Sequence, residues 1–220
     1  MYQPKQFEVS DAVTLQAAMR AHPLGTLVTL QGGELVADEI PFVFDPTPSA
    51  DHPHGVLKAH VARANPLWQR HDAAHRVLVV FKGPQAYVSP SWYATKAEHG
   101  KAVPTWNYIV VQASGHLHHK DGDTAWLRGQ LETLTHAHES ARRDPWQVSD
   151  APPDYIAQTM KAIVGIEIPI DTLAGKWKVS QNQPAANRDG VVRGLAEAPH
   201  GMPDAVAMAH VVRTHTGSAT

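Results

Sequence analysis

Residues 77–81, Val-Leu-Val-Val-Phe, are apolar at every position and open the longer stretch RVLVVFKGPQAYVS. Side chains alternate between the two faces of a strand, so Val77, Val79 and Phe81 share one face and the apolar residues between them share the other. A strand with two apolar faces needs cover on both sides. The stretch therefore predicts a strand that is central in its sheet or lies inside a closed sheet.

Further strands are predicted on both sides of this one. Alternating or β-branched apolar residues recur in segments that are separated by Gly-Gly, by a loop rich in Pro, Asp and His, or by the turn sequence KDGD. Segments of this kind, connected in chain order, are typical of antiparallel strands. The predicted strands are residues 25–30, 34–44, 55–62, 105–119, 163–170 and 174–181.

Helices are predicted before, between and after these strands. The first begins after Ser10 or Asp11, either of which can cap it, and a short one begins at Asn65, which a proline follows directly. A helical pair starts at about residue 124, and a short helix precedes the C-terminal tail. Six or so antiparallel strands with helical additions indicate the α+β class, in the form of a small β-barrel.

The charge of the chain is nearly balanced, with 19 Lys and Arg against 21 Asp and Glu and a formal net charge of −2. A protein that binds a phosphate backbone normally has a basic surface, so charge does not favour nucleic acid as a partner. The N-terminus has no apolar targeting segment, and no apolar run approaches the ~20 residues of a spanning helix. We therefore expect a cytoplasmic protein with no membrane partner.

Several kinds of chemistry are excluded by what the sequence lacks. There is no cysteine, which excludes disulfides, thiolate metal sites and cysteine nucleophiles. The glycine-rich nucleotide motifs, the esterase motif and the zinc-protease motif are also missing. The 15 histidines include His116 and His118 on one strand face, but no carboxylate stands at ligand spacing beside them. We predict no metal site, and no residue stands out as a general base or nucleophile.

The segment YVSPSWYATKAEHGKAVPTWNY gathers aromatic rings, hydroxyl groups and prolines directly after the central strand. The proline between Ser89 and Ser91 favours an extended backbone, and continued extension would place both hydroxyls on one side. Trp92 and Tyr93 follow at once. A hydrophobic core explains the rings equally well, but it does not explain the paired serines.

Two distant segments add positive charge. HVARANP places Arg63 beside the start of the short helix at Asn65, where free backbone N–H groups favour an anion. GKWKVSQN places Lys176, Lys178 and Ser180 on one strand face. A ligand with a phosphate and a planar ring system, above all FMN, would use all of these groups. In the alternative interpretation, Arg63 is a surface ion-pair partner, and Lys176 and Lys178 protect an exposed strand edge against pairing with another strand.

Seven blocks of the sequence resemble a known family in their order and in their residues. They read MYQPKQFEVSD, GTLVTL, HVARANPLW, FKGPQAYVSPSWY, VPTWNY, IVGIEIPI and GKWKVSQN. The family that they resemble is the PaiB-type family of FMN-binding split-barrel proteins, known as negative transcriptional regulators. The resemblance covers Met1 to about Leu195, and the one visible departure is Ile166 in place of a phenylalanine.

The resemblance implies a six-stranded antiparallel split β-barrel that forms a homodimer and holds FMN at the subunit interface. Residues 1–195 would form this domain, with a helical insertion at about 123–163, and residues 196–220 would be a C-terminal tail with room for a short helix. The phosphate contacts map to HVARANP and to the two serines, and KWKVSQN approaches the ring. The implied cofactor-binding residues are Arg63, Asn65, Ser89, Ser91, Trp92, Tyr93, Lys178 and Gln181.

Three functions remain open at this point. The first is a flavoprotein whose FMN serves redox chemistry, as in an FMN-dependent oxidoreductase, or sensing. The second is a DNA-binding repressor with a structural FMN, which the charge balance does not favour. The third is a haem-binding or haem-degrading split-barrel protein, suggested by fold analogy and by the histidines alone.

Overall fold

The computed structural model describes residues 1–47, 52–198 and 202–215. The chain divides into two compact units, each built from separate stretches of the sequence. The first unit comprises Met1–Leu15, Lys82–Val111 and Ala174–Thr220, and the second comprises Gln16–Phe81 and Gln112–Leu173. Strands and helices that are distant in sequence therefore meet within each unit.

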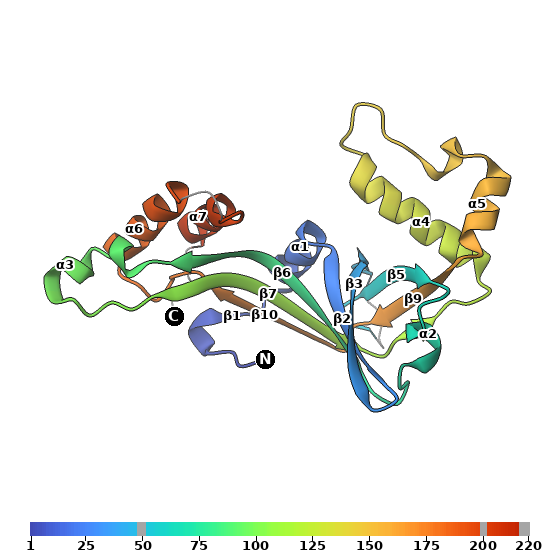
Figure 1. Ribbon diagram of the computed structural model, residues 1–220, viewed down its shortest axis with the longest axis horizontal. Coiled ribbons are helices and arrows are strands. Elements are labelled where there is room, and N and C mark those ends of the chain that lie inside the picture. The colour runs from blue at the N-terminus through green and yellow to red at the C-terminus, as the bar shows by residue number, and fades with distance from the viewer. Residues whose placement is uncertain (48–51, 199–201, 216–220) are drawn as a thin grey trace. The chain divides into compact units, whose positions relative to one another are not determined.

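The strands form one sheet of six and one of four, with antiparallel pairing in each. In sheet order, the larger contains β1 (Glu8–Val9), β10 (Thr172–Lys178), β7 (Thr105–Gly115), β6 (Val77–Val88), β2 (Leu24–Gln31) and β3 (Glu34–Pro41). The smaller contains β4 (Val43–Asp45), β5 (Val56–Ala62), β9 (Ile163–Pro169) and β8 (His118–His119). Figure 1 labels most of these strands.

Strand β6 is the long apolar strand expected from the sequence. Within the second unit Val77, Val79 and Phe81 are each at most 2% exposed. In the sheet β6 lies between β7 and β2, so it is an interior strand. This confirms the predicted central position and the α+β class with antiparallel strands, although the six-stranded sheet is open rather than closed.

Two stretches that were predicted as single strands each divide between the two sheets. The N–H of Phe42 donates to the carbonyl of Pro23 at 2.8 Å, which continues the β2–β3 register by one pair, but Pro23 has no N–H to return the bond. Strand β3 therefore ends there, and β4 begins in the other sheet. Strand β7 ends at Gly115, where a Cβ would overlap the carbonyl oxygen of Pro169. The expected strands 34–44 and 105–119 were thus wrong as continuous elements.

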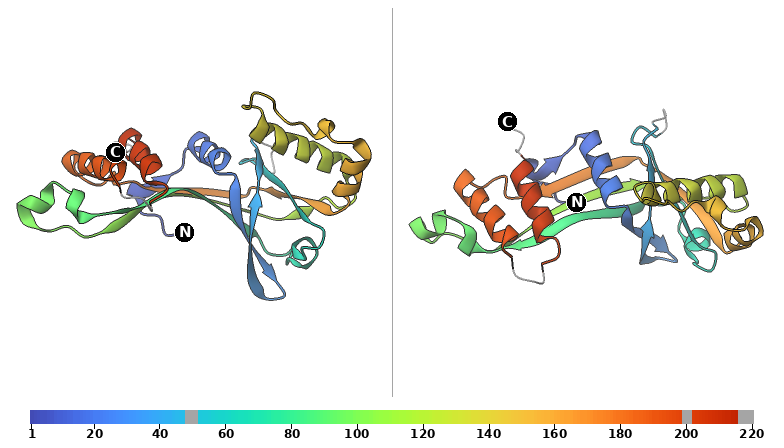
Figure 2. Two further views of the ribbon diagram at one scale, coloured as in Figure 1. Left: turned by 45° about the horizontal axis from the view of Figure 1, so that its top comes forward. Right: turned by 90° about the horizontal axis from the view of Figure 1, so that it is seen from above.

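In the second unit, α4 (Thr124–Glu139) and α5 (Pro153–Met160) contact strands of the smaller sheet, and the 3₁₀ turn η3 (Val148–Asp150) packs on α4. The short helix α2 (Leu67–Arg70) contacts β2 of the larger sheet. Asp123 caps α4 by accepting the Trp126 N–H at 2.9 Å. Helices α4 and α5 lie together beside β5 and β9 (Figures 1 and 2). Their shared core contains Leu127, Val148, Ile156 and Met160, which confirms the predicted helical pair.

The first unit contains most of the remaining short elements. They are η1 (Lys5–Phe7), η2 (Pro90–Trp92), α3 (Thr95–His99), α6 (Ala185–Ala196) and α7 (Ala205–Thr214), and helix α1 (Ala12–Ala21) begins in this unit. Asp11 rather than Ser10 caps α1, because its Oδ2 accepts the N–H of Thr14 at 2.8 Å. Helix α3 lies within the segment between Tyr93 and Thr105.

Helices α6 and α7 lie side by side (Figures 1 and 2). Helix α6 starts at Ala185, earlier than the short helix expected near residues 191–195, and α7 occupies part of the expected tail. Ala205, Met208, Ala209 and Val212 are buried on one face of α7. Their spacing of i, i+3, i+4, i+7 is the pattern of an amphipathic helix, and it is present in the sequence.

Helix α6 packs closely on Trp92 because it presents two glycines there. A Cβ at Gly190 would overlap the backbone carbonyl oxygen of Trp92, and a Cβ at Gly194 would overlap its indole ring. The backbone of Trp92 has little freedom to move away, since η2 is held by hydrogen bonds from Trp92 and Tyr93 to Ser89 and Pro90. The two glycines therefore set how near α6 approaches the end of β6.

We predict that Gly190→Ala destabilises the protein by about 1–3 kcal/mol, because the methyl group must displace a backbone carbonyl. The matched control is Gly129→Ala in α4, where a Cβ meets nothing within 4 Å. There alanine should stabilise by about 0.5–1 kcal/mol through helix propensity. Urea denaturation midpoints measure both, and equal effects of the two variants would contradict the close packing on Trp92.

Candidate functional site

The first unit contains a polar cavity of about 370 Å³. It lies beside the ends of β7 and β10 and takes residues from η1, α3 and the start of α6. Lys101 and Lys178 supply two positive charges, and among the described residues of its lining there is no carboxylate. The lining residues are Gln6, Phe7, Tyr93, Thr95, Lys101, Ala102, Val103, Thr105, Asn107, Lys178, Ser180, Asn182, Gln183 and Asn187.

Lys178 and Ser180 reach the cavity from the end of β10. The Lys178 ammonium donates a hydrogen bond to the hydroxyl of Thr105. Ser180 has a φ of +63°, the one positive φ among non-glycine residues in the described part of the chain. Asn107, only 1% exposed, donates to Ser180 Oγ at 2.9 Å. Backbone strain of this kind costs on the order of 1–3 kcal/mol and is concentrated at functional sites.

The expected shared face of Lys176, Lys178 and Ser180 does not extend to Ser180. Strand β10 ends at Lys178, and Ser180 begins the turn to Gln183, so it no longer follows strand alternation. Lys176 lies apart from the cavity, with its ammonium 5.5 Å from the ring centre of Tyr2 and 5.4 Å from that of Tyr108. It donates to the Tyr2 carbonyl at 3.0 Å.

The two predicted serines meet, but through a turn. Pro90 begins the 3₁₀ turn η2, and Ser89 caps that turn by accepting the Ser91 N–H at 3.2 Å. The two hydroxyl oxygens lie 2.7 Å apart. Ser91 and Trp92 line a smaller cavity of about 340 Å³ together with Arg193. The hydroxyls thus converge as expected, although the extended backbone that was to bring them together is absent.

Tyr93 is the predicted aromatic residue that reaches the polar cavity. It follows η2 directly and is 8% exposed. Like Lys178, it lines the polar cavity. Burial raises the pKa of its phenol, because desolvation disfavours the charged form. At neutral pH the Tyr93 hydroxyl is therefore a neutral group that can both donate and accept a hydrogen bond.

The Gln181 side chain does not line the polar cavity, and its hydrogen bonds connect parts of the chain. Its Oε1 accepts the Val179 N–H at 2.8 Å, and its Nε2 donates to the carbonyls of Gln6 at 3.1 Å and Trp177 at 2.5 Å. Both ends of the carboxamide are thus used within the first unit. They attach the N-terminal segment to the turn that follows β10.

A buried amide network at the start of α6 was not predicted from the sequence. Asn187 is 3% exposed, accepts the Thr95 N–H at 3.1 Å, and donates to the Thr95 hydroxyl and to Gln183 Oε1, each at 3.0 Å. This network fixes the cavity end of α3 against α6. An asparagine two residues after the first helical position gave no distinguishing signal.

Arg63 and Asn65 belong to the second unit, where their polar atoms have protein partners. Arg63 donates to the Lys161 carbonyl at 2.7 Å and forms an ion pair with Asp121 at 2.9 Å, and its guanidinium lies 5.6 Å from the Trp68 ring centre. Asn65 accepts the Leu67 N–H at 2.9 Å and donates to Asp38 at 3.0 Å. The first of these bonds ties Asn65 to the start of the short helix α2, which begins at Leu67 with Pro66 as its N-cap.

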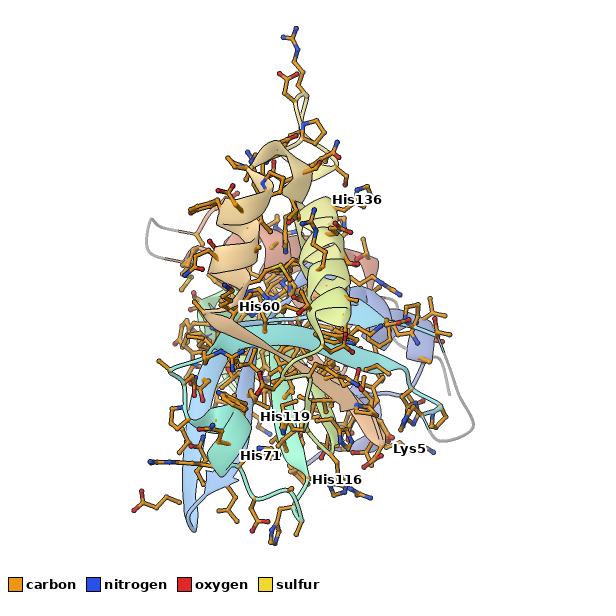
Figure 3. All side chains as sticks on the ribbon, turned by 90° about the vertical axis from the view of Figure 1, so that its right-hand side faces the viewer. Lys5, His60, His71, His116, His119 and His136 are labelled. Carbon is orange, nitrogen blue, oxygen red and sulfur yellow. The ribbon has the colours of Figure 1, made fainter. Side chains whose placement is uncertain are left out.

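The histidines of the second unit gather partly around α2. His71 and His119 line a cavity of about 540 Å³ together with Trp68 and His118, and Figure 3 labels His71, His116 and His119 in that region. Within residues 1–47, 52–198 and 202–215, no group of three or more His, Asp or Glu side chains is arranged to hold a metal ion. Also within these ranges, none of the helices combines the length and apolar character needed to cross a membrane.

The donors of the polar cavity fit FMN. A phosphate dianion needs cations and hydroxyl or amide donors, and the ring system offers carbonyl and nitrogen acceptors. Lys178 and Lys101 provide the charge, and Thr105, Asn182 and Gln183 provide neutral donors. The volume lies within the range of about 300–1,000 Å³ that is usual for small-molecule sites.

Comparisons with known proteins define the class. The chain belongs to the family whose model is described as "Putative FMN-binding domain", which matches residues 1–172. It is 30% identical over 212 residues to protease synthase and sporulation protein PAI 2 of Bacillus subtilis, covering 96% of each chain. It is also 39% identical over 212 residues to an uncharacterized protein of Emericella nidulans, covering 82% of this chain and 84% of the other.

Solved structures share the fold. The FAD and haem binding protein of Mycobacterium smegmatis has a TM-score of 0.52 at 17% identity, covering 77% of this chain and 72% of the other. The flavocytochrome Anf3 of Azotobacter vinelandii has a TM-score of 0.51 at 14% identity, covering 78% and 69%. The PaiB-type family, the split-barrel fold and FMN as the cofactor of the family are thus confirmed.

We predict that Asn107→Ala destabilises the protein by about 1–3 kcal/mol, since it leaves the buried Ser180 hydroxyl without its donor. Once Ser180→Ala has removed that hydroxyl, the same substitution should cost less, with a coupling of about 0.5–1.5 kcal/mol. A double-mutant cycle by chemical denaturation measures this coupling. Strictly additive effects would mean that the pair does not stabilise the positive φ at Ser180.

Proposed function

We propose that the protein is a flavoprotein that binds FMN in the polar cavity of the first unit. The observation that carries this is a cavity with two lysines, several neutral donors and no lining carboxylate among the described residues, beside a strained Ser180. Lys178, Lys101 and Tyr93 are the residues that would contact the cofactor. Family membership supplies the identity of the cofactor.

Bound FMN supplies one- and two-electron redox chemistry. In this proposal, the residues of the chain bind the flavin and adjust its reduction potential. A lysine beside the electron-rich pyrimidine end of a flavin stabilises added negative charge, and the neutral Tyr93 phenol provides a hydrogen bond without adding charge. The proposed activity is that of an FMN-dependent oxidoreductase or a flavin-based sensor.

A homodimer with flavin at its interface is the finer form of this proposal. On the first unit, β6 and β7 expose aromatic side chains: Trp106 is 53% exposed, and its ring packs edge-on against Tyr87 with centroids 6.1 Å apart. Val103, next to the cavity, is 74% exposed. Exposed aromatic residues of this kind are enriched at interfaces between proteins. A second copy of this chain is the partner that we propose for this surface.

A regulatory role remains a hypothesis. The Bacillus subtilis relative is named for protease synthesis and sporulation, but a net charge of −2 gives this chain little electrostatic attraction for DNA. Regulation through a flavin-dependent change of partner is compatible with that charge. Direct repression would require a basic surface.

We predict that purified protein is yellow and quenches FMN fluorescence on titration. Replacing Lys178 by Met should weaken FMN binding by about 10- to 100-fold, because one charge-assisted hydrogen bond is lost. The control Lys82→Met removes an exposed lysine of β6 that does not line the cavity, and it should leave affinity unchanged. Equal affinities for the two variants would exclude this cavity as the flavin site.

We also predict that Trp106→Glu shifts the protein from dimer to monomer, because a charge at the centre of an apolar contact must be desolvated. Tyr155→Glu is the control, since Tyr155 is a 62% exposed aromatic residue on α5 of the other unit. Light scattering coupled to size exclusion measures the mass. A monomeric native protein would remove the dimer proposal while leaving FMN binding open.

A further inference from the structure

A second cavity, open to solvent on one side, lies in the other unit, where α4 passes over the edge of the smaller sheet. It has a volume of about 470 Å³ and shares no residue with the proposed flavin cavity. Strands β4 and β5 form one wall, and one face of α4 forms the other. The lining residues are Val43, Phe44, Asp45, Pro46, Lys58, Ala125, Trp126, Gly129, Gln130 and Thr133.

Gln130 leaves an unused hydrogen-bond donor at this cavity. The residue is 4% exposed, and its Oε1 pairs with His60 Nδ1 at 2.9 Å. The Nε2 atom is buried and has no hydrogen-bond partner. Figure 3 labels His60, which belongs to β5 and lies next to α4. A buried donor without a partner costs about 1–3 kcal/mol, so an acceptor supplied by a ligand would recover that loss.

Gly129 keeps the helix wall open. It stands in the middle of α4, where glycine costs about 1 kcal/mol relative to alanine, yet a Cβ at this position would meet nothing within 4 Å. No neighbouring group in the described structure therefore requires glycine here. The missing side chain leaves space in the cavity next to Gln130.

Two aromatic side chains of the lining are held in place by their neighbours. The Trp126 ring packs against Gly165 of β9, where a Cβ would overlap it. Phe44 is 8% exposed, and the Arg20 guanidinium lies 5.0 Å from its ring centre. Two aromatic walls of this kind suit a flat apolar ligand.

The charged groups at the cavity neutralise each other. Lys58 donates to Asp45 at 2.7 Å, and this hydrogen bond, with a second from the Thr47 N–H, lowers the pKa of Asp45 to about 2. Asp45 is therefore ionised at neutral pH and forms an ion pair with the Lys58 ammonium. A ligand with its own charge would have to compete with this pair, whereas an uncharged one would not.

We propose that this cavity binds a small, uncharged, planar aromatic molecule that carries a carbonyl group. The carbonyl oxygen accepts the free Gln130 Nε2–H, and the ring lies against Phe44 and Trp126. Gly129 provides the space that the ring fills. This site is separate from the proposed flavin site, so its test does not depend on FMN binding.

The experiment titrates full-length ¹⁵N-labelled protein with benzamide, the simplest probe of this chemistry, and with benzoate as its charged counterpart. Ligands of this size bind at roughly millimolar concentrations. We expect saturable NMR shifts of the Gln130 side-chain amide and the Trp126 indole N–H with benzamide, and at least about tenfold weaker binding of benzoate, whose charge must compete with the Asp45–Lys58 pair.

Substitution of Gly129 provides the matched test. Gly129→Leu should abolish the benzamide shifts by filling the cavity, whereas Gly129→Ala, which adds a methyl group with room to spare, should keep them. FMN binding should be the same in both variants. The absence of saturable shifts in the native protein, equal binding of benzoate, or undiminished binding in a folded Gly129→Leu protein would each overturn the proposal.

Discussion

Within the second unit, the close approach of Gly115 to the Pro169 carbonyl fixes how the ends of β7 and β9 meet. There β7 and β9 reach the points where the chain leaves one sheet for the other. The crossing is held by backbone bonds from Asp171 N–H to Ser114 at 2.9 Å and from Ile170 N–H to Gly55 at 3.0 Å. Any side chain at residue 115 would separate them. Strand β7 and the strand that follows β9, β10, continue into the first unit, where they carry Asn107 and Lys178 to the polar cavity.

Local sequence pattern was enough to predict most of the fold. The two-faced apolar strand, the antiparallel pairs and the helical pair after Asp123 all follow from periodicity and capping. The divisions at Phe42 and Gly115 could not be predicted in this way. At the first, the β2–β3 ladder ends beside Pro23, which has no N–H to donate, and the second depends on contact with Pro169. Periodicity reports which faces are buried, not which of two sheets buries them.

The candidate site was predictable in part. Tyr93 and Lys178 meet at one cavity, as residue type and the family resemblance suggested. The positive φ of Ser180 and its support by Asn107 had no signal in the sequence, because both arise from a turn after β10. Arg63 and Gln181 were also predicted to bind the cofactor, from residue type and the family resemblance. In the structure, the polar atoms of both side chains bond to neighbouring protein groups.

The N-terminal residues are tied to β10 along much of their length. Gln3 donates to the Gly175 carbonyl at 2.5 Å, Lys176 donates to the Tyr2 carbonyl, and Gln181 to that of Gln6. Tyr2 is nonetheless 84% exposed. Solvent exposure would class such positions as tolerant of change, but these bonds fasten the segment that supplies Gln6 and Phe7 to the cavity wall. Because the Tyr2 and Gln6 bonds use backbone carbonyls, deletion of the segment, rather than substitution of its side chains, would reveal this attachment as a loss of ligand affinity.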